Sequence, residues 1–156
     1  MIRITFLLLF GLSSIQTFAA QTNNYPLNKV KTVQSAWDCF QGPFRSYQTW
    51  VDWLSTNKPN FSLERFPFSE RAFNNYQASL NCYHFTYKVG NVSVDGFIIY
   101  PKKYDNALPA IIYNRGGNTS YGRNTFGRMM FRHMPLAAQN YVIIGSDYRG
   151  ADNRQR

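Results

Sequence analysis

Two turns in the last third of the chain hold the residue types best suited to chemistry. The first, Arg115-Gly116-Gly117-Asn118, and the second, Asp147-Tyr148-Arg149-Gly150, each follow an apolar run directly. Because glycine has no Cβ, the backbone of the first turn can bend tightly and bring its N–H groups close to a bound atom. Such N–H groups stabilise the oxyanion that develops during acyl transfer. We therefore take Arg115, Gly116, Gly117 and Asn118 as a candidate oxyanion-binding site.

The glycine pair is open to other interpretations. Its N–H groups could cradle a phosphate, but the chain has neither a dinucleotide-binding fingerprint nor a phosphate-loop Gly-Lys-Ser/Thr. The pair could also be no more than a tight turn between a strand and a helix. A metal site is not expected, because two cysteines and two histidines without close spacing make a poor zinc site. We expect no cofactor either.

The hydrophobic pattern predicts the elements that must position these turns. The apolar runs 110–113 and 141–144 have the length of buried strands, and apolar residues between them recur at helical spacing. This order predicts a βαβ unit whose parallel strands carry the turns at their carboxyl ends, where open α/β sheets bind ligands. Pro135 should kink the helix or start a second short one. The stripe expected in the core is Phe126, Met129, Met130, Met134, Ala137 and Ala138.

Upstream of this unit the pattern changes from helix to strand. Residues 20–35 are polar and predict a loose lead-in, and apolar residues then recur at helical spacing from 36 to 54, broken at Gly42-Pro43. A further helix is predicted from Glu70 to Gln77, capped by Ser69. Alternation over 83–89 and 92–100, with Gly90-Asn91 between, predicts a β-hairpin. Residues 20–82 thus form a helical amino-terminal extension.

The amino terminus and the cysteines indicate export. Residues 1–19 combine a positive start, a short apolar stretch and small residues at the end, as a signal peptide does. The alternative is a membrane anchor, but the apolar stretch is short of the roughly 20 residues that a spanning helix needs. We expect no stable membrane insertion after cleavage. In an exported chain two cysteines favour a disulfide between Cys39 and Cys82, with two free thiols as the alternative.

The chain is basic, with a formal net charge of +9. One interpretation is a patch for nucleic acid or anionic lipid. We favour a solvated basic surface and no nucleic acid partner, because the arginines are spread through turns and a helix. Attraction of an acidic substrate stays open. The arginines near the end of the chain are Arg115, Arg123, Arg128, Arg132, Arg149, Arg154 and Arg156.

Over residues 83–152 the chain resembles the α/β-hydrolase fold, and within it the prolyl oligopeptidase family of serine peptidases. The resemblance rests on the hairpin, the glycine turn, and the strand that ends in Asp-Tyr-Arg-Gly. It implies that Arg115 stands where relatives often have a histidine or tyrosine that donates to the oxyanion. It also implies that Asp147 and Arg149 are structural and pair to hold the second turn. The expected fold is α/β: a partial hydrolase sheet, made of the hairpin and the parallel βαβ unit, preceded by a short helical layer.

The family's nucleophile is a serine in a Gly-x-Ser-x-Gly pentapeptide, and no such pentapeptide occurs here. We therefore expect residues 83–156 to be a truncated hydrolase domain with no catalytic triad, inactive alone. The full-length protein would be an exported serine hydrolase that cleaves a peptide or ester substrate. One alternative is a new triad from Ser120 or Ser146 with His133 and Asp147. Another is a non-catalytic exported binding protein that uses the aromatic and basic surface.

The same interpretation makes a prediction about the surface of the sheet. Parallel sheets are normally covered by helices on both faces. The strand that carries Asp147 has no later strand and helix in this sequence to cover it. We therefore expect exposed apolar surface and an open sheet edge.

Overall fold

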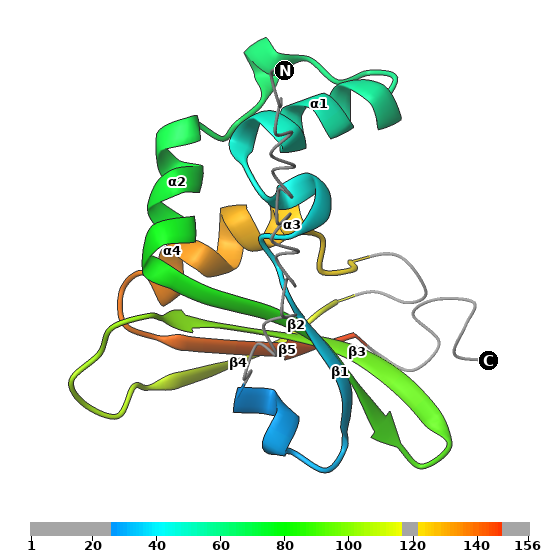
Figure 1. The fold of residues 1–156 in the computed structure, drawn as a ribbon, viewed down its shortest axis with the longest axis vertical. Coiled ribbons are helices and arrows are strands. Elements are labelled where there is room, and N and C mark those ends of the chain that lie inside the picture. The colour runs from blue at the N-terminus through cyan, green and yellow to red at the C-terminus, as the bar shows by residue number, and fades with distance from the viewer. Residues whose placement is uncertain (1–25, 117–121, 148–156) are drawn as a thin grey trace, which may run out of the picture.

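A computed structural model describes residues 26–116 and 122–147 of the protein. Its centre is an open, mixed sheet of five strands in the spatial order β1-β2-β3-β5-β4, with the α-helices gathered on one side (Figure 1). The coarse prediction of an α/β fold is therefore confirmed. The strands are β1 Val33–Asp38, β2 Leu80–Val89, β3 Val92–Pro101, β4 Ala110–Asn114 and β5 Val142–Ser146.

The predicted hairpin forms. Strands β2 and β3 pair antiparallel along their whole length, and Val89 pairs with Val92 on either side of the Gly90-Asn91 turn. Gly90 has a φ of +59°, a conformation that glycine adopts without a steric cost. Strand β2 begins at Leu80 rather than at Tyr83, because its first residues pair with the end of β3.

The βαβ unit also forms. Strands β4 and β5 are parallel, and β5 lies between β4 and β3. The connection is helical in three pieces: α3 Phe126–Arg128, a π-helical segment Met129–His133, and α4 Met134–Ala137. Pro135 lies in the first turn of α4, where proline is well tolerated, so it starts a short helix as predicted.

The amino-terminal extension is not purely helical, which corrects the prediction. Residues 33–38 form β1, an antiparallel edge strand paired with β2, where the sequence predicted a loose lead-in and then a helix. Pairing with the free edge of the hairpin satisfies the backbone hydrogen bonds of this polar stretch, a tertiary effect that outweighs local pattern. Two helices do follow, α1 Tyr47–Asn57 and α2 Glu70–Ser79. Ser69 caps α2 as predicted, its Oγ accepting from the N–H of Ala72 at 3.2 Å.

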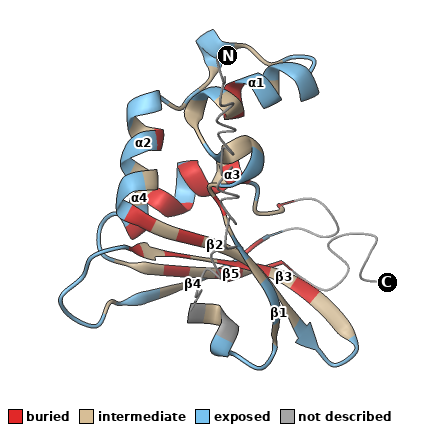
Figure 2. Cartoon of the chain, viewed as in Figure 1, coloured by how far each residue is buried: buried red, intermediate tan, exposed pale blue. Residues whose placement is uncertain are grey.

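The core lies between the sheet and the helices. Buried residues lie along the helical connection 126–137 and in the middle strands, whereas α2 is mostly exposed and contributes Phe73 (Figure 2). The methionine stripe of the βαβ connection is part of this core, as predicted, although Ala138 is exposed. The core residues include Phe73, Leu80, Phe97, Ile99, Met129, Met130, Met134 and Ile143.

A disulfide joins the extension to the sheet. Cys39 follows β1 and is bonded to Cys82 in β2, which confirms the predicted pairing. The closed loop has a sequence separation of 43, for which the chain-entropy model gives a stabilisation of about 4 kcal/mol. The bond is compatible with an extracellular location. Within the described residues, none of the helices is both long enough and apolar enough to cross a bilayer.

The sheet face that points away from the helices is partly uncovered, as predicted. The strand that leads to Asp147 does not form the expected open edge, however, because β5 is paired with β3 on one side and β4 on the other. A groove of about 400 Å³ runs along the uncovered face, lined by residues that include Val30, Phe85 and Ile144. The short 3-10 turn η1, Pro26–Lys29, flanks the groove through Leu27. Ile112 in β4 is 73% exposed there.

Candidate functional site

The site lies where β4 and β5 end. Asn114 and Ser146, the last residues of the two strands, are paired in the parallel register. Arg115 and Asp147 follow them directly, so both side chains emerge at the same edge of the sheet. Because side chains alternate along a strand, Arg115 shares the helix-covered face with Ile111 and Tyr113, which pack against the core.

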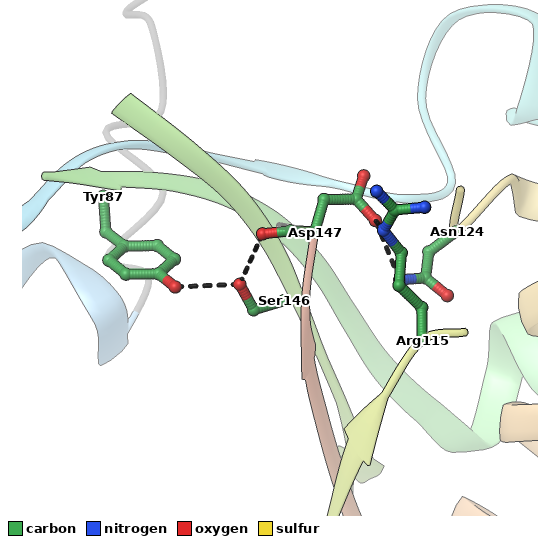
Figure 3. Close-up of polar contacts among 5 residues, drawn as sticks. All are labelled: Tyr87, Arg115, Asn124, Ser146 and Asp147. Carbon is green, nitrogen blue, oxygen red and sulfur yellow. Dashed lines mark hydrogen bonds and ion pairs between the residues drawn. The ribbon is translucent and has the colours of Figure 1, made fainter. Parts of the chain in front are cut away.

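Arg115 and Asp147 form a buried ion pair (Figure 3). The Nε of Arg115 lies 3.4 Å from Oδ1 of Asp147, a distance at which the attraction is mainly Coulombic. The Arg115 side chain has no exposed surface, and that of Asp147 is 11% exposed. Nδ2 of Asn124 donates to the same carboxylate oxygen at 3.2 Å. The guanidinium therefore belongs to a buried polar cluster rather than to the solvent-facing side of the turn.

Burial dominates the electrostatics of this cluster. It raises the pKa of Asp147 above 3.8, and the nearby Arg115 and Arg123 guanidinium groups oppose that rise. Two charges taken out of water are stable only when each has its partner, because desolvation costs several kcal/mol per ion. Arg115 and Asp147 thus depend on each other, and together they tie the start of the glycine turn to the end of β5.

The backbone of β5 is anchored on both sides of the site. The N–H of Asp147 donates to the carbonyl of Asp95 in β3 at 2.8 Å. Oγ of Ser146 donates to the carbonyl of Asp147 at 2.9 Å and lies 2.8 Å from the hydroxyl of Tyr87. These contacts fix the backbone at Asp147, from which the carboxylate faces Arg115.

The glycine turn is only partly described. Gly116 is exposed, and no atom lies within 4 Å of the position that a Cβ would take there. Gly122 has a φ of +80°, and a Cβ on it would overlap the carbonyl oxygen of Gly116. The two glycines thus bring the ends of the turn into contact. Gly117, Asn118 and Arg149 lie outside the described residues, so their proposed roles stay predictions.

The structure does not bring the alternative triad together. Ser146 lines the groove on the open face of the sheet, whereas His133 packs on the helix-covered face against Phe97 and Tyr113. The sheet therefore separates the hydroxyl from the imidazole. Ser120 lies outside the described residues.

His133 is an unusual residue in this region. It ends the π-helical segment, is 2% exposed, and its Nε2 has no hydrogen-bond partner among the described residues. Burial and the nearby Arg132 and Arg128 lower its pKa to about 4. The imidazole is therefore neutral at pH 7 and packs as an aromatic ring.

Sequence reasoning missed Asn124. It lies just before Thr125, which caps α3 by accepting from the N–H of Arg128 at 3.3 Å. A cap motif predicts where the helix begins, but no motif predicts that the residue before the cap reaches back to Asp147. In the described part of the chain, no group of three or more His, Cys, Asp or Glu residues could hold a metal ion.

Comparison of the chain with protein-family models, curated proteins and solved structures gave no match.

Proposed function

We propose that the chain is the amino-terminal part of an exported serine hydrolase that cleaves a peptide or ester bond. The observation that carries the proposal is the buried Arg115–Asp147 pair at the carboxyl edge of two parallel strands, directly before an exposed glycine turn. Hairpin, strand, glycine turn, helix and parallel strand follow one another in the order that the resemblance to prolyl oligopeptidases implies. That edge is where open α/β sheets bind ligands.

In the proposed reaction the turn acts on the substrate carbonyl. A serine Oγ attacks the carbonyl carbon, and the carbonyl oxygen takes up negative charge as the tetrahedral intermediate forms. Backbone N–H groups at Gly116 and Gly117 donate to that oxygen, and such preorganised donors need little reorganisation during the reaction. The serine, its base and its acid come from a part of the protein after residue 156.

Arg115 has a positioning role in this proposal. Its guanidinium is buried against Asp147, so it holds the first residue of the turn rather than reaching for the substrate. The family position that often holds a histidine or tyrosine donor would then contribute stability here. Oxyanion binding would be left to the backbone.

A pair of substitutions at Gly116 tests the oxyanion role in the longer protein. Gly116→Pro removes the N–H, whereas Gly116→Ala keeps it and has open space for the Cβ. We expect the proline variant to lower kcat about 10²- to 10³-fold and the alanine variant to change it little. Unfolding midpoints of both variants separate catalysis from stability. Equal activity of the proline and wild-type proteins would contradict the role.

A further inference from the structure

A second cavity lies beside the candidate site, between the helical layer and the loop that leads into α3. Its volume is about 680 Å³, within the range of sites that hold small organic ligands. One wall comes from α1, which stands over α3 in Figure 1. The opposite wall is the segment 123–127, which includes Asn124. The cavity therefore adjoins the Arg115–Asp147 cluster, although neither Arg115 nor Asp147 lines it.

The walls of this aromatic cleft are built from rings that support one another. Trp50 packs edge-on against Phe66 with centroids 4.8 Å apart, and lies 5.2 Å from Phe68. Phe44 packs against Trp53 at 6.1 Å. Trp53 is 36% exposed, so part of its indole faces solvent, whereas Trp50 is buried. Contacts of this kind hold the rings in place, which leaves a rigid apolar surface for a ligand.

The charged side chains that line the aromatic cleft are cationic. Lys58 at the end of α1 and Arg123 line it, and no acidic side chain does so among its described residues. His84 also lines the cleft, stacked on Trp37, and burial lowers its pKa, so it adds no positive charge at neutral pH. An anion that enters the cleft thus meets two positive groups and no negative one.

We infer that the aromatic cleft binds a small molecule that carries both an aromatic ring and a carboxylate. The ring would pack against Trp53 and Phe68, and the carboxylate would lie toward Lys58 and Arg123. Apolar walls with a few placed polar groups are what small-molecule sites share. The inference does not rest on the hydrolase proposal, because it concerns binding and involves residues of the helical layer.

The test is a titration of the oxidised 156-residue chain, followed by tryptophan fluorescence and by calorimetry. The probes are 3-phenylpropionate, its uncharged amide, and 3-cyclohexylpropionate, which keeps the carboxylate and lacks the aromatic ring. We expect saturable binding of 3-phenylpropionate, with the amide weaker by about 3-fold, as a partly exposed ion pair contributes. We expect 3-cyclohexylpropionate to be weaker by a similar factor. Absence of saturable binding, or equal affinity for all three probes, would overturn the inference.

Variants locate the binding. Trp53→Ala should weaken binding of 3-phenylpropionate about 10-fold through lost ring contact. Lys58→Gln should reduce the preference for the acid over the amide, leaving the part that Arg123 contributes, whereas Lys103→Gln, outside the cleft, should keep the full preference. Lys58 is chosen over Arg123 because the charge of Arg123 also lowers the pKa of Asp147, so changing it would disturb the candidate site.

Gly127 offers a steric test. A Cβ there would lie 3.7 Å from Trp50, an ordinary contact, so Gly127→Ala should bind the probe nearly as well as wild type. Gly127→Leu should fill the cleft and abolish binding. If the leucine variant does not fold, the affinity of Trp53→Ala for 3-phenylpropionate tests the location of the site instead. Binding that survives Trp53→Ala and Lys58→Gln unchanged would place the ligand elsewhere.

Discussion

At the scale of single residues, the candidate site is a small buried network around one carboxylate. The Asp147 carboxylate accepts a hydrogen bond from Asn124 and faces the Arg115 guanidinium. The backbone N–H of Asp147 donates to the carbonyl of Asp95. Each contact satisfies a group that could not be left bare in the interior. The family resemblance implied a pairing of Asp147 with Arg149, which lies outside the described residues and stays a prediction. The structure shows that Arg115, directly after the neighbouring strand β4, faces Asp147.

Removing the negative charge of the pair should destabilise the protein strongly. Asp147→Asn takes away the carboxylate that faces the buried Arg115 guanidinium, which should lower the free energy of unfolding by about 3–5 kcal/mol. Urea unfolding of the two proteins measures the difference. The control is Asp105→Asn, an exposed position, which should change stability by less than about 0.5 kcal/mol. A loss of similar size in both variants would show that the pair is not structural.

The buried imidazole should make stability depend on pH. The pKa of His133 is about 4 in the folded chain and near 6.5 in the unfolded chain, so between these pH values protons bind the unfolded chain more readily. Stability should fall as the pH falls from 6.5 to about 4. The charged or titratable groups near His133 are Arg132 on the same segment, Arg128 in α3 and Tyr113 on β4.

His133→Leu provides the measurement. On unfolding between pH 6.5 and about 4, the wild-type protein should take up as much as about one proton through His133. His133→Leu should lose this uptake, so its stability should depend less on pH. His84→Phe is the control for the other histidine, whose pKa burial also lowers. Asp147 acts with the opposite sign, because its raised pKa favours the folded state on acidification. A profile that His133→Leu leaves unchanged would contradict the buried neutral imidazole.

At the scale of elements, local pattern predicted the hairpin and the βαβ unit well. Both depend on short-range signals: Gly90-Asn91 between alternating runs, and apolar runs around a helical stripe. Strand β1 could not be predicted in this way, because its partner is the edge of β2, far along the chain. Asn124 and the aromatic cleft were missed for the same reason, since the contacts of both join segments that are distant in sequence.

Two matched glycine substitutions test what holds the glycine turn together. Gly122 and Gly90 both have positive φ, but only Gly122 has backbone where a Cβ would go. Gly90→Ala should cost about 1 kcal/mol from conformation alone. Gly122→Ala should cost clearly more, because the Gly116 carbonyl must move. Thermal unfolding of both variants compares the costs, and equal losses would show that the Gly116–Gly122 contact does not hold the turn.

At the scale of the whole molecule, one face of the sheet carries helices and the other carries an apolar groove. Large exposed apolar patches on soluble domains usually mark contacts with other protein surfaces. Ile112→Thr, at the 73% exposed position of β4, should change stability by less than about 0.5 kcal/mol, because the side chain is not packed in the core. Urea unfolding measures the difference, and a clearly larger loss would contradict the exposure of this face.

The proposed function joins the three scales: a buried pair holds a turn, two parallel strands place it, and a hydrolase domain uses it. The most direct test is labelling with a fluorophosphonate, which reacts with activated serines, followed by mass spectrometry of the labelled peptide. We predict that a chain of residues 1–156 is not labelled. We predict that the longer protein is labelled once, at a serine within Gly-x-Ser-x-Gly after residue 156. Stoichiometric labelling of the 156-residue chain, or no labelling of the longer protein, would contradict the proposal.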